Sequence, residues 1–285
     1  LSLGGLDAAW RNIDPSLRMH GDRIPLAKLF SYTLIPLSVG MFPHIFMHWL
    51  TARDRQAFRL PVIAYPLCVA VVWLPSVVLG VLGTASKPGL EGPAANSILL
   101  QMISMHAPEF LVGLLGAGVF AAVMSSLDSQ ILSLSTLFTQ DFIRHHRGAE
   151  TMDERQKIRL GRIFVVTLLA ATYLLSLVSN RSIFGLGIWS FTGFAALFPL
   201  VVAALYWRRS NKYGAWASVT TVSILWLYFF LRGWSASGYT VADTGLMPIA
   251  IILPASALAM VVGTFLGPRP PKDLVDRFFP TGSER

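Results

Sequence analysis

The chain has 285 residues and a net charge of +8, and 54% of its residues are hydrophobic whereas only 13% are charged. Soluble domains carry about 25% charged residues, so this composition excludes an ordinary soluble protein and indicates a polytopic membrane protein. The one cysteine, Cys68, excludes an intramolecular disulfide and a thiolate metal cluster.

The first 24 residues are polar and contain Gly-Gly and Asp-Pro turn signals, so they predict a loop outside the membrane. Seven apolar segments follow, each long enough to span a hydrocarbon core of about 30 Å. We expect them at about residues 28–49, 61–83, 108–141, 163–180, 184–207, 214–231 and 247–267.

The first apolar segment contains three residues that interrupt a helix, namely Pro36, Gly40 and Pro43. Proline removes a backbone hydrogen bond, so this segment cannot keep regular helical bonding throughout. Broken helices in the middle of the membrane are how secondary transporters present backbone atoms to substrates and ions. A simple proline kink is the alternative explanation.

The basic residues gather on one side of the predicted membrane. The loops 51–60, 142–162 and 208–213 and the tail from residue 268 hold 16 of the 23 Lys and Arg residues. Cytoplasmic loops are the basic ones, so we expect these segments and the C-terminus in the cytoplasm and residues 1–24 on the opposite side. The positive charge is thus a topology signal, and we do not expect nucleic acid as a partner.

The segment 108–141 carries a stripe of hydroxyl groups. On a helical wheel the stripe falls within an arc of about 100° that contains Ala122, Ser125, Ser126, Ser129, Ser133 and Thr136. The hydroxyls of Ser125 and Ser126 and the carbonyl of Ala122 could supply three oxygen ligands to a small monovalent cation, with further oxygens from another helix. Alternatively, the two serines donate hydrogen bonds to carbonyls of their own helix.

Asp128 is the one carboxylate in the interior of a predicted span. Charged groups inside a membrane are costly and are functional by default. This carboxylate could join a cation site with Ser125 and Ser129, carry protons, or make a structural hydrogen bond to another helix. His44 and His48 have the spacing of two metal ligands on one helix, but an intramembrane metal enzyme built on them lacks further ligands.

Three segments resemble the sodium/solute symporter family. The signature helix of that family is similar to AAVMSSLDSQILSLSTLFTQDF (121–142), and its sixth and tenth core helices are similar to GMFPHIFMHWLTARDRQ (40–56) and FTGFAALFPLVVAALYWRR (191–209). The family has a LeuT-type core, formed by two inverted repeats of five helices. The resemblance therefore implies an all-α polytopic membrane protein with seven transmembrane helices.

The same resemblance implies a division of the chain into three parts. Residues 1–24 would form an extracytoplasmic loop, 25–209 the second repeat with core helices six to ten, and 210–285 two appended helices and a cytoplasmic tail. The first repeat would lie outside this sequence, so we expect a fragment whose partner is the N-terminal half of the transporter.

The resemblance also implies site residues. The family's sodium site corresponds to Ala122, Ser125 and Ser126. A second sodium site of some members corresponds to Ser125, Asp128 and Ser129, although those members have serine at the position of Asp128. Substrate contacts are expected around Gly40, Phe42, His44, Trp189 and Thr192.

We therefore expect the C-terminal half of a sodium-coupled symporter for a small organic solute, integral to the cell membrane and in contact with its lipid bilayer. Sodium would be the coupling ion, with no other cofactor and no enzymatic activity. The alternative is a transporter-like sensory module, because the family's membrane domain also occurs fused to histidine kinases. The tail from residue 268 contains no kinase sequence, which favours transport.

Overall fold

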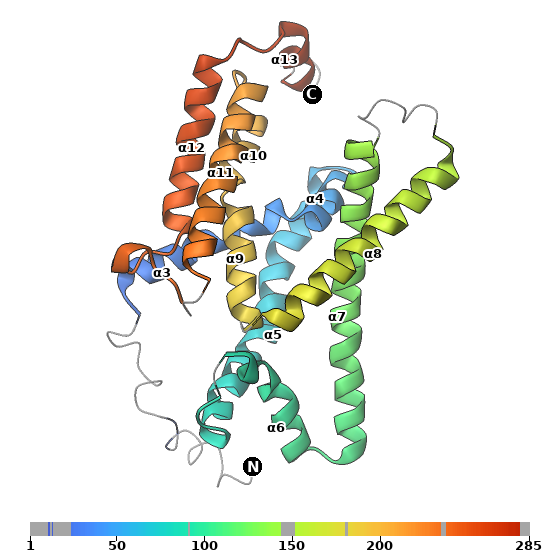
Figure 1. Cartoon of the computed structure of the whole chain (residues 1–285), viewed down its shortest axis with the longest axis vertical. Helices are drawn as coiled ribbons and strands as arrows, with labels where there is room; N and C mark the ends of the chain where they lie inside the picture. The colour runs from blue at the N-terminus through green and yellow to red at the C-terminus, as the bar shows by residue number, and fades with distance from the viewer. Residues whose placement is uncertain are drawn as a thin grey trace. The chain divides into compact units, whose positions relative to one another are not determined.

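The computed structural model describes residues 11, 13, 24–90, 92–143, 152–179, 182–234 and 238–279, and its regular elements are all helical (Figure 1). Within this part of the chain, six helices are long and apolar enough to cross a membrane, and a bent pair of helices makes a seventh candidate. The prediction of an all-α polytopic membrane protein is thereby confirmed, with six candidate spans, or seven if the bent pair is one span, near the predicted positions.

The chain packs as two compact units. The first unit comprises Leu1–Met19 and Pro43–Ser182, and the second comprises His20–Phe42 and Ile183–Arg285. These units group the segments that contact one another most. They do not test the predicted repeat at 25–209 or the predicted appended helices at 210–285. That division stays a prediction.

Long apolar runs account for the main helices of the first unit. Pro66 and Pro75 lie inside the 28-residue helix α5 without dividing it. A short helix in the predicted loop 84–107, α6, was not predicted. The elements of this unit are α4 (Pro43–Leu50), η2 (Arg55–Phe58), α5 (Arg59–Ser86), η3 (Gly92–Ser97), α6 (Ile98–His106), α7 (Glu109–Leu137), the π-helical η4 (Phe138–Ile143) and α8 (Glu154–Val178).

The second unit contains a hydrophobic core that includes most of the buried hydrophobic side chains among the described residues. Its elements are α3 (Leu26–Leu34), η1 (Ile35–Met41), α9 (Ile183–Ala195), α10 (Phe198–Tyr206), α11 (Lys212–Arg232), η6 (Val241–Asp243), α12 (Ile249–Leu266) and α13 (Lys272–Phe278). The predicted span 184–207 is confirmed as one candidate membrane span, Ile183–Tyr206, but it contains two helices, since α9 ends at Ala195 and Pro199 lies in the first turn of α10. The buried core residues are Ile35, Trp189, Ala195, Ala196, Val222, Phe229, Met247, Ile249 and Ile252.

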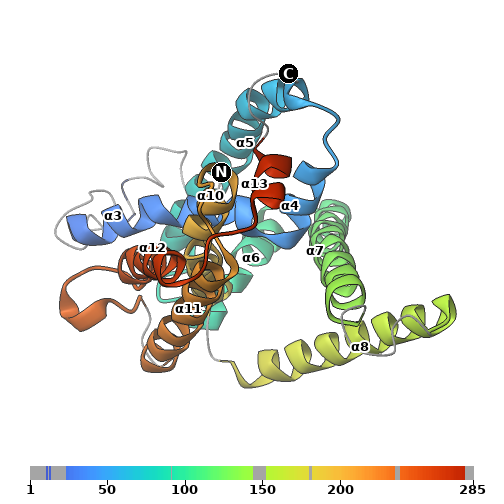
Figure 2. The same ribbon diagram turned by 90° about the horizontal axis from the view of Figure 1, so that it is seen from above.

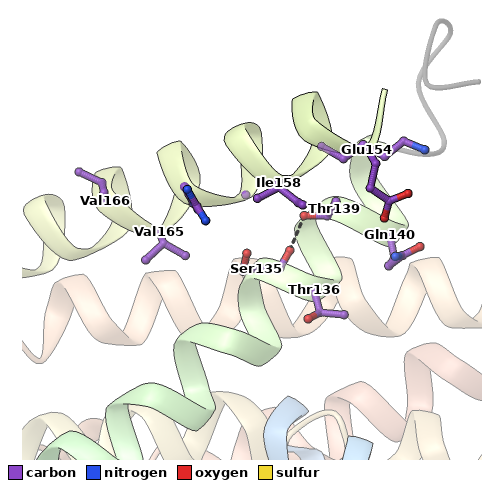
Figure 3. A pocket seen from close by; sticks show the side chains of 11 residues that line it. Ser135, Thr136, Thr139, Gln140, Glu154, Ile158, Val165 and Val166 are labelled. Atoms are coloured by element: carbon purple, nitrogen blue, oxygen red, sulfur yellow. Dashed lines mark hydrogen bonds between the residues drawn. The ribbon is translucent and has the colours of Figure 1, made fainter. Parts of the chain in front are cut away.

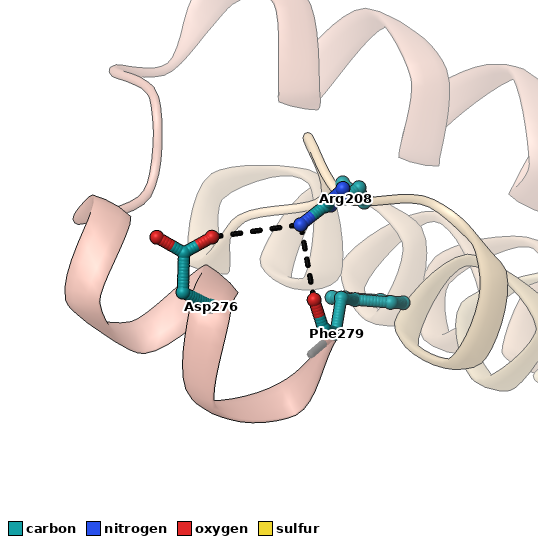
Figure 4. A network of polar contacts seen from close by, with 3 residues as sticks. All are labelled: Arg208, Asp276 and Phe279. Atoms are coloured by element: carbon teal, nitrogen blue, oxygen red, sulfur yellow. Dashed lines mark hydrogen bonds and ion pairs between the residues drawn. The ribbon is translucent and has the colours of Figure 1, made fainter. Parts of the chain in front are cut away.

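Helices α11 and α12 run side by side (Figures 1 and 2), and polar groups tie them and their flanking segments together. The hydroxyls of Ser218 and Ser256 are buried and lie 2.9 Å apart. Arg208, between α10 and α11, contacts the segment that follows α12. Its guanidinium donates a hydrogen bond to the carbonyl of Phe279 at 3.0 Å and pairs with the Asp276 carboxylate at 3.5 Å (Figure 4). These exposed contacts join the start of the 208–213 turn to α13.

The first predicted span is broken as expected. Helix α3 ends at Leu34, residues 35–41 form a 3-10 helix, and Phe42 has an extended backbone before Pro43 begins α4. Pro36 lies in the first turn of η1, where its missing N–H breaks no helical bond. The prediction of a discontinuous helix is confirmed, and a kink in a continuous helix does not describe this segment.

The orientation of the chain stays a prediction that cysteine labelling can test. In a Cys68→Ala background, Gly148→Cys and Ser283→Cys, which lie outside the described residues, should react with an impermeant maleimide only after cells are permeabilised. Lys87→Cys, in an exposed turn predicted to face the opposite side, is the matched control and should react in intact cells. Labelling of Gly148→Cys or Ser283→Cys in intact cells would reverse the topology.

Candidate functional site

Helix α7 places the predicted cation ligands. It runs for 29 residues from Glu109, which follows Pro108, and continues as the wider π-helical turn η4. At about 1.5 Å per residue it is about 44 Å long, so it crosses a bilayer with turns to spare. A helix of this length places the middle of the hydroxyl stripe inside the membrane.

The hydroxyls of α7 divide into two groups by their hydrogen bonds. Toward its end, three of them, those of Ser129, Ser133 and Thr136, donate to carbonyls three or four residues earlier at 2.8–3.0 Å, and Thr139 in η4 does the same at 2.7 Å. The side chains of Ser125 and Ser126 make no hydrogen bond to any described residue. Ala122, Ser125 and Ser126 are all exposed. The serine pair therefore keeps its oxygen atoms accessible for a ligand, and the cation site stays a prediction.

Asp128 is also exposed on α7, and its carboxylate has no ion pair or hydrogen bond within the described part of the chain. Its neighbour Ser129 is half-buried and donates its hydroxyl hydrogen bond to the carbonyl of Ser126 at 3.0 Å. The second cation site of Ser125, Asp128 and Ser129 stays a prediction, as does proton transfer by Asp128.

The predicted substrate residues on α9 are buried in the second unit. Trp189 is 7% exposed and Thr192 is 1% exposed. The Trp189 carbonyl accepts a hydrogen bond from the indole of Trp226 at 2.9 Å, and the Trp189 ring packs against Phe230 and Tyr239. Trp189 thus acts as a packing residue here, with little surface left for a solute.

The other predicted substrate residues lie around the break in the first span. Gly40 is buried in η1, and the Phe42 ring lies 4.7 Å from that of Phe194 and 5.5 Å from that of Phe191. These contacts join the break to α9 within the second unit. His44 belongs to α4 of the first unit, so the structure does not unite it with the others in one packed body. The substrate role of all five residues stays a prediction.

His44 and His48 both lie on α4. Among the described residues, no three His, Cys, Asp or Glu side chains are grouped so that they could hold a metal ion.

Comparison with known proteins decides the family. The family model of the sodium:solute symporter family matches residues 12–221 of the chain. The chain belongs to this family. It is 26% identical over 269 residues to the osmoregulated proline transporter OpuE of Bacillus subtilis, a match that covers 92% of this chain and 52% of that protein.

A sodium/proline symporter of Staphylococcus aureus is 30% identical over 220 residues, which are 72% of this chain and 41% of the relative. The chain spans about half the length of the curated relatives it matches. The symporter family match includes all of α7 and ends within α11, before α12 begins. Family membership and the apolar helices together establish an integral membrane protein.

Sequence analysis missed one feature of the first unit, a pocket where α8 packs against the end of α7 (Figure 3). The basic segment 142–162 was predicted only as a cytoplasmic loop. A sequence signal was present, because Lys157, Gly161 and Val165 recur at every fourth position and therefore share one face of α8, with the small Gly161 at its centre.

Proposed function

We propose that this chain is part of a sodium-coupled symporter that carries a small organic solute across the cell membrane. The observation that supports this most directly is the exposed serine pair on α7, whose hydroxyls are not bonded back to their own helix. In a member of the sodium:solute symporter family, such a pair beside the Ala122 carbonyl is half of a cation site. Sodium is the coupling ion, and no further cofactor is needed.

The oxygen atoms of this site are suited to a hard cation. Hydroxyl and carbonyl oxygens are the ligands that such ions prefer. Ala122, Ser125 and Ser126 supply three of them from one helix, so other ligands must come from a second helix, which the resemblance places outside this sequence. An ion held between two helices stabilises the conformation that brings them together, and so couples ion binding to solute binding.

Proline is the first solute to test. Both relatives described above are named as proline transporters, and one of them as a sodium/proline symporter. The identities of 26% and 30% leave room for a different small solute, because the residues that contact it set specificity.

Uptake by the whole protein that carries this sequence tests the proposal. In proteoliposomes, an inward sodium gradient should drive accumulation of proline, or of another small solute in a panel of amino acids, and an equal potassium gradient should not. Accumulation that is the same without sodium would refute the coupling. Solute binding without any accumulation would favour the sensory module.

The same proteoliposomes separate the two roles of Asp128. If its carboxylate ligates a second sodium ion, Asp128→Asn should lower the number of sodium ions transported per solute. If it carries a proton, the variant should keep its sodium dependence and lose most of the pH dependence of uptake. Asp141→Asn, an exposed carboxylate in η4, is the matched control and should change neither. An Asp128→Asn variant that behaves like wild type in both measurements would leave no coupling role for this carboxylate.

A further inference from the structure

The pocket between α7 and α8 has a volume of 540 Å³ and lies within the first unit. One wall is formed by hydroxyl and amide side chains from the end of α7 and from η4, namely Ser135, Thr136, Thr139 and Gln140. The facing wall on α8 holds the cations Lys157 and Arg162. One carboxylate, Glu154, also lines the pocket, so the cations outnumber it.

Gly161 sets the distance between the two walls. A Cβ atom at this position would lie 3.0 Å from the Ser135 hydroxyl oxygen and 3.3 Å from that of Thr139. The hydroxyl wall therefore approaches the backbone of α8 directly. Thr139 donates its own hydroxyl hydrogen bond to the Ser135 carbonyl at 2.7 Å, across the start of the π-helical turn (Figure 3).

The pocket changes from polar to apolar along its length. Figure 3 shows Glu154 and Gln140 at one end and Val165 and Val166 at the other. Both helices are membrane-span candidates, and the polar end lies where α7 finishes and α8 starts. The polar end is therefore at the membrane–water interface, and the two valines lie farther toward the hydrocarbon.

We propose that this pocket binds the headgroup of an anionic phospholipid from the adjacent leaflet. The hydroxyls of Thr136 and Thr139 already donate to carbonyls of their own helix, so the phosphodiester accepts hydrogen bonds from the Ser135 hydroxyl and the Gln140 amide. Lys157 and Arg162 add charge-assisted contacts, while an acyl chain follows Val165 and Val166. The segment 142–162 holds six Lys and Arg residues and three Asp and Glu residues, so its net positive charge also attracts an anion. Basic pockets between transmembrane helices are recognised binding places for such headgroups.

Binding is measured by thermal unfolding of the whole protein in neutral detergent with added phosphatidylglycerol or phosphatidylcholine. Phosphatidylglycerol should raise the melting temperature, because a ligand that binds only the folded state stabilises it. The pair Lys157→Gln and Arg162→Gln should raise the phosphatidylglycerol concentration needed for half of that shift by about tenfold or more. The matched double variant, Arg155→Gln with Arg159→Gln, removes the same charge from exposed positions of α8 outside the pocket lining. It should leave the phosphatidylglycerol concentration for half of the shift unchanged.

Three results would overturn the proposal. If both double variants needed equally more phosphatidylglycerol for half of the shift in melting temperature, the lipid would be attracted by the basic segment in general. If neither variant needed more, the pocket would hold no lipid. Stabilisation by inorganic phosphate alone at the same concentration would identify a soluble anion in place of a lipid. None of these measurements depends on transport, so the outcome is independent of the proposed symport.

Discussion

Ser126→Ala in the whole protein is expected to weaken the apparent affinity for sodium by about ten- to a hundredfold. The change removes one oxygen ligand and leaves the helix intact, because the Ser126 side chain is exposed and makes no hydrogen bond to a described residue. Losing a contact to a charged group costs about 1.5–3 kcal/mol, which corresponds to that range of affinity. Initial rates of solute uptake over a series of sodium concentrations measure the effect.

Uptake by the Ser126→Ala variant should recover in part at saturating sodium, because the remaining ligands still define a site. Ser125→Ala should behave in the same way. The matched control is Ser133→Ala, which removes a hydroxyl from the same helix whose hydrogen bond goes to the Ser129 carbonyl at 2.8 Å. Uptake by Ser125→Ala and Ser126→Ala that equals wild type at limiting sodium would refute the sodium site.

The spans could be predicted because each depends on a local property of the sequence. An apolar run of membrane length identifies a span wherever it occurs, and Pro36 and Pro43 identify the break in the first one. Helices α6 and α13 were missed because nine and seven residues are too few to give a membrane-length apolar run. The break before α10 was missed even though Pro199 marked it.

The candidate site was less accessible to sequence reasoning because it depends on distant contacts. A helical wheel places Ser126 and Ser133 on one stripe, yet only Ser133 donates to its own helix within the described residues. Trp189 is predicted to contact the solute, and that role stays a prediction; its packing against the Trp226 indole and the Phe230 ring, which come from 37 or more residues away, could not be predicted. The sequence pattern on α9 alone could not show which helix would cover it.

The largest loss of stability is expected for Gly214→Leu, at the tight contact between α11 and α12. A Cβ atom at Gly214 would collide with the Thr264 hydroxyl and lie 2.7 Å from the Met260 carbonyl oxygen. Gly263 faces it in the same way, since its Cβ would lie 2.8 Å from that of Ala217. Small residues let membrane helices approach closely, and overpacking such a contact costs about 1–3 kcal/mol or more.

Thermal unfolding in detergent should therefore show a melting temperature several degrees lower for Gly214→Leu than for wild type. Thr220→Leu places the same leucine side chain at an exposed position of α11, and is the control that should change little. Equal melting temperatures for Gly214→Leu and wild type would refute the close packing of α11 on α12.

The sodium affinity of the folded Gly214→Leu protein should stay near that of wild type, because Gly214 belongs to the second unit and the serine pair on α7 to the first. A lower melting temperature without a change in sodium affinity would thus separate the residues that hold the second unit together from those proposed to bind the ion.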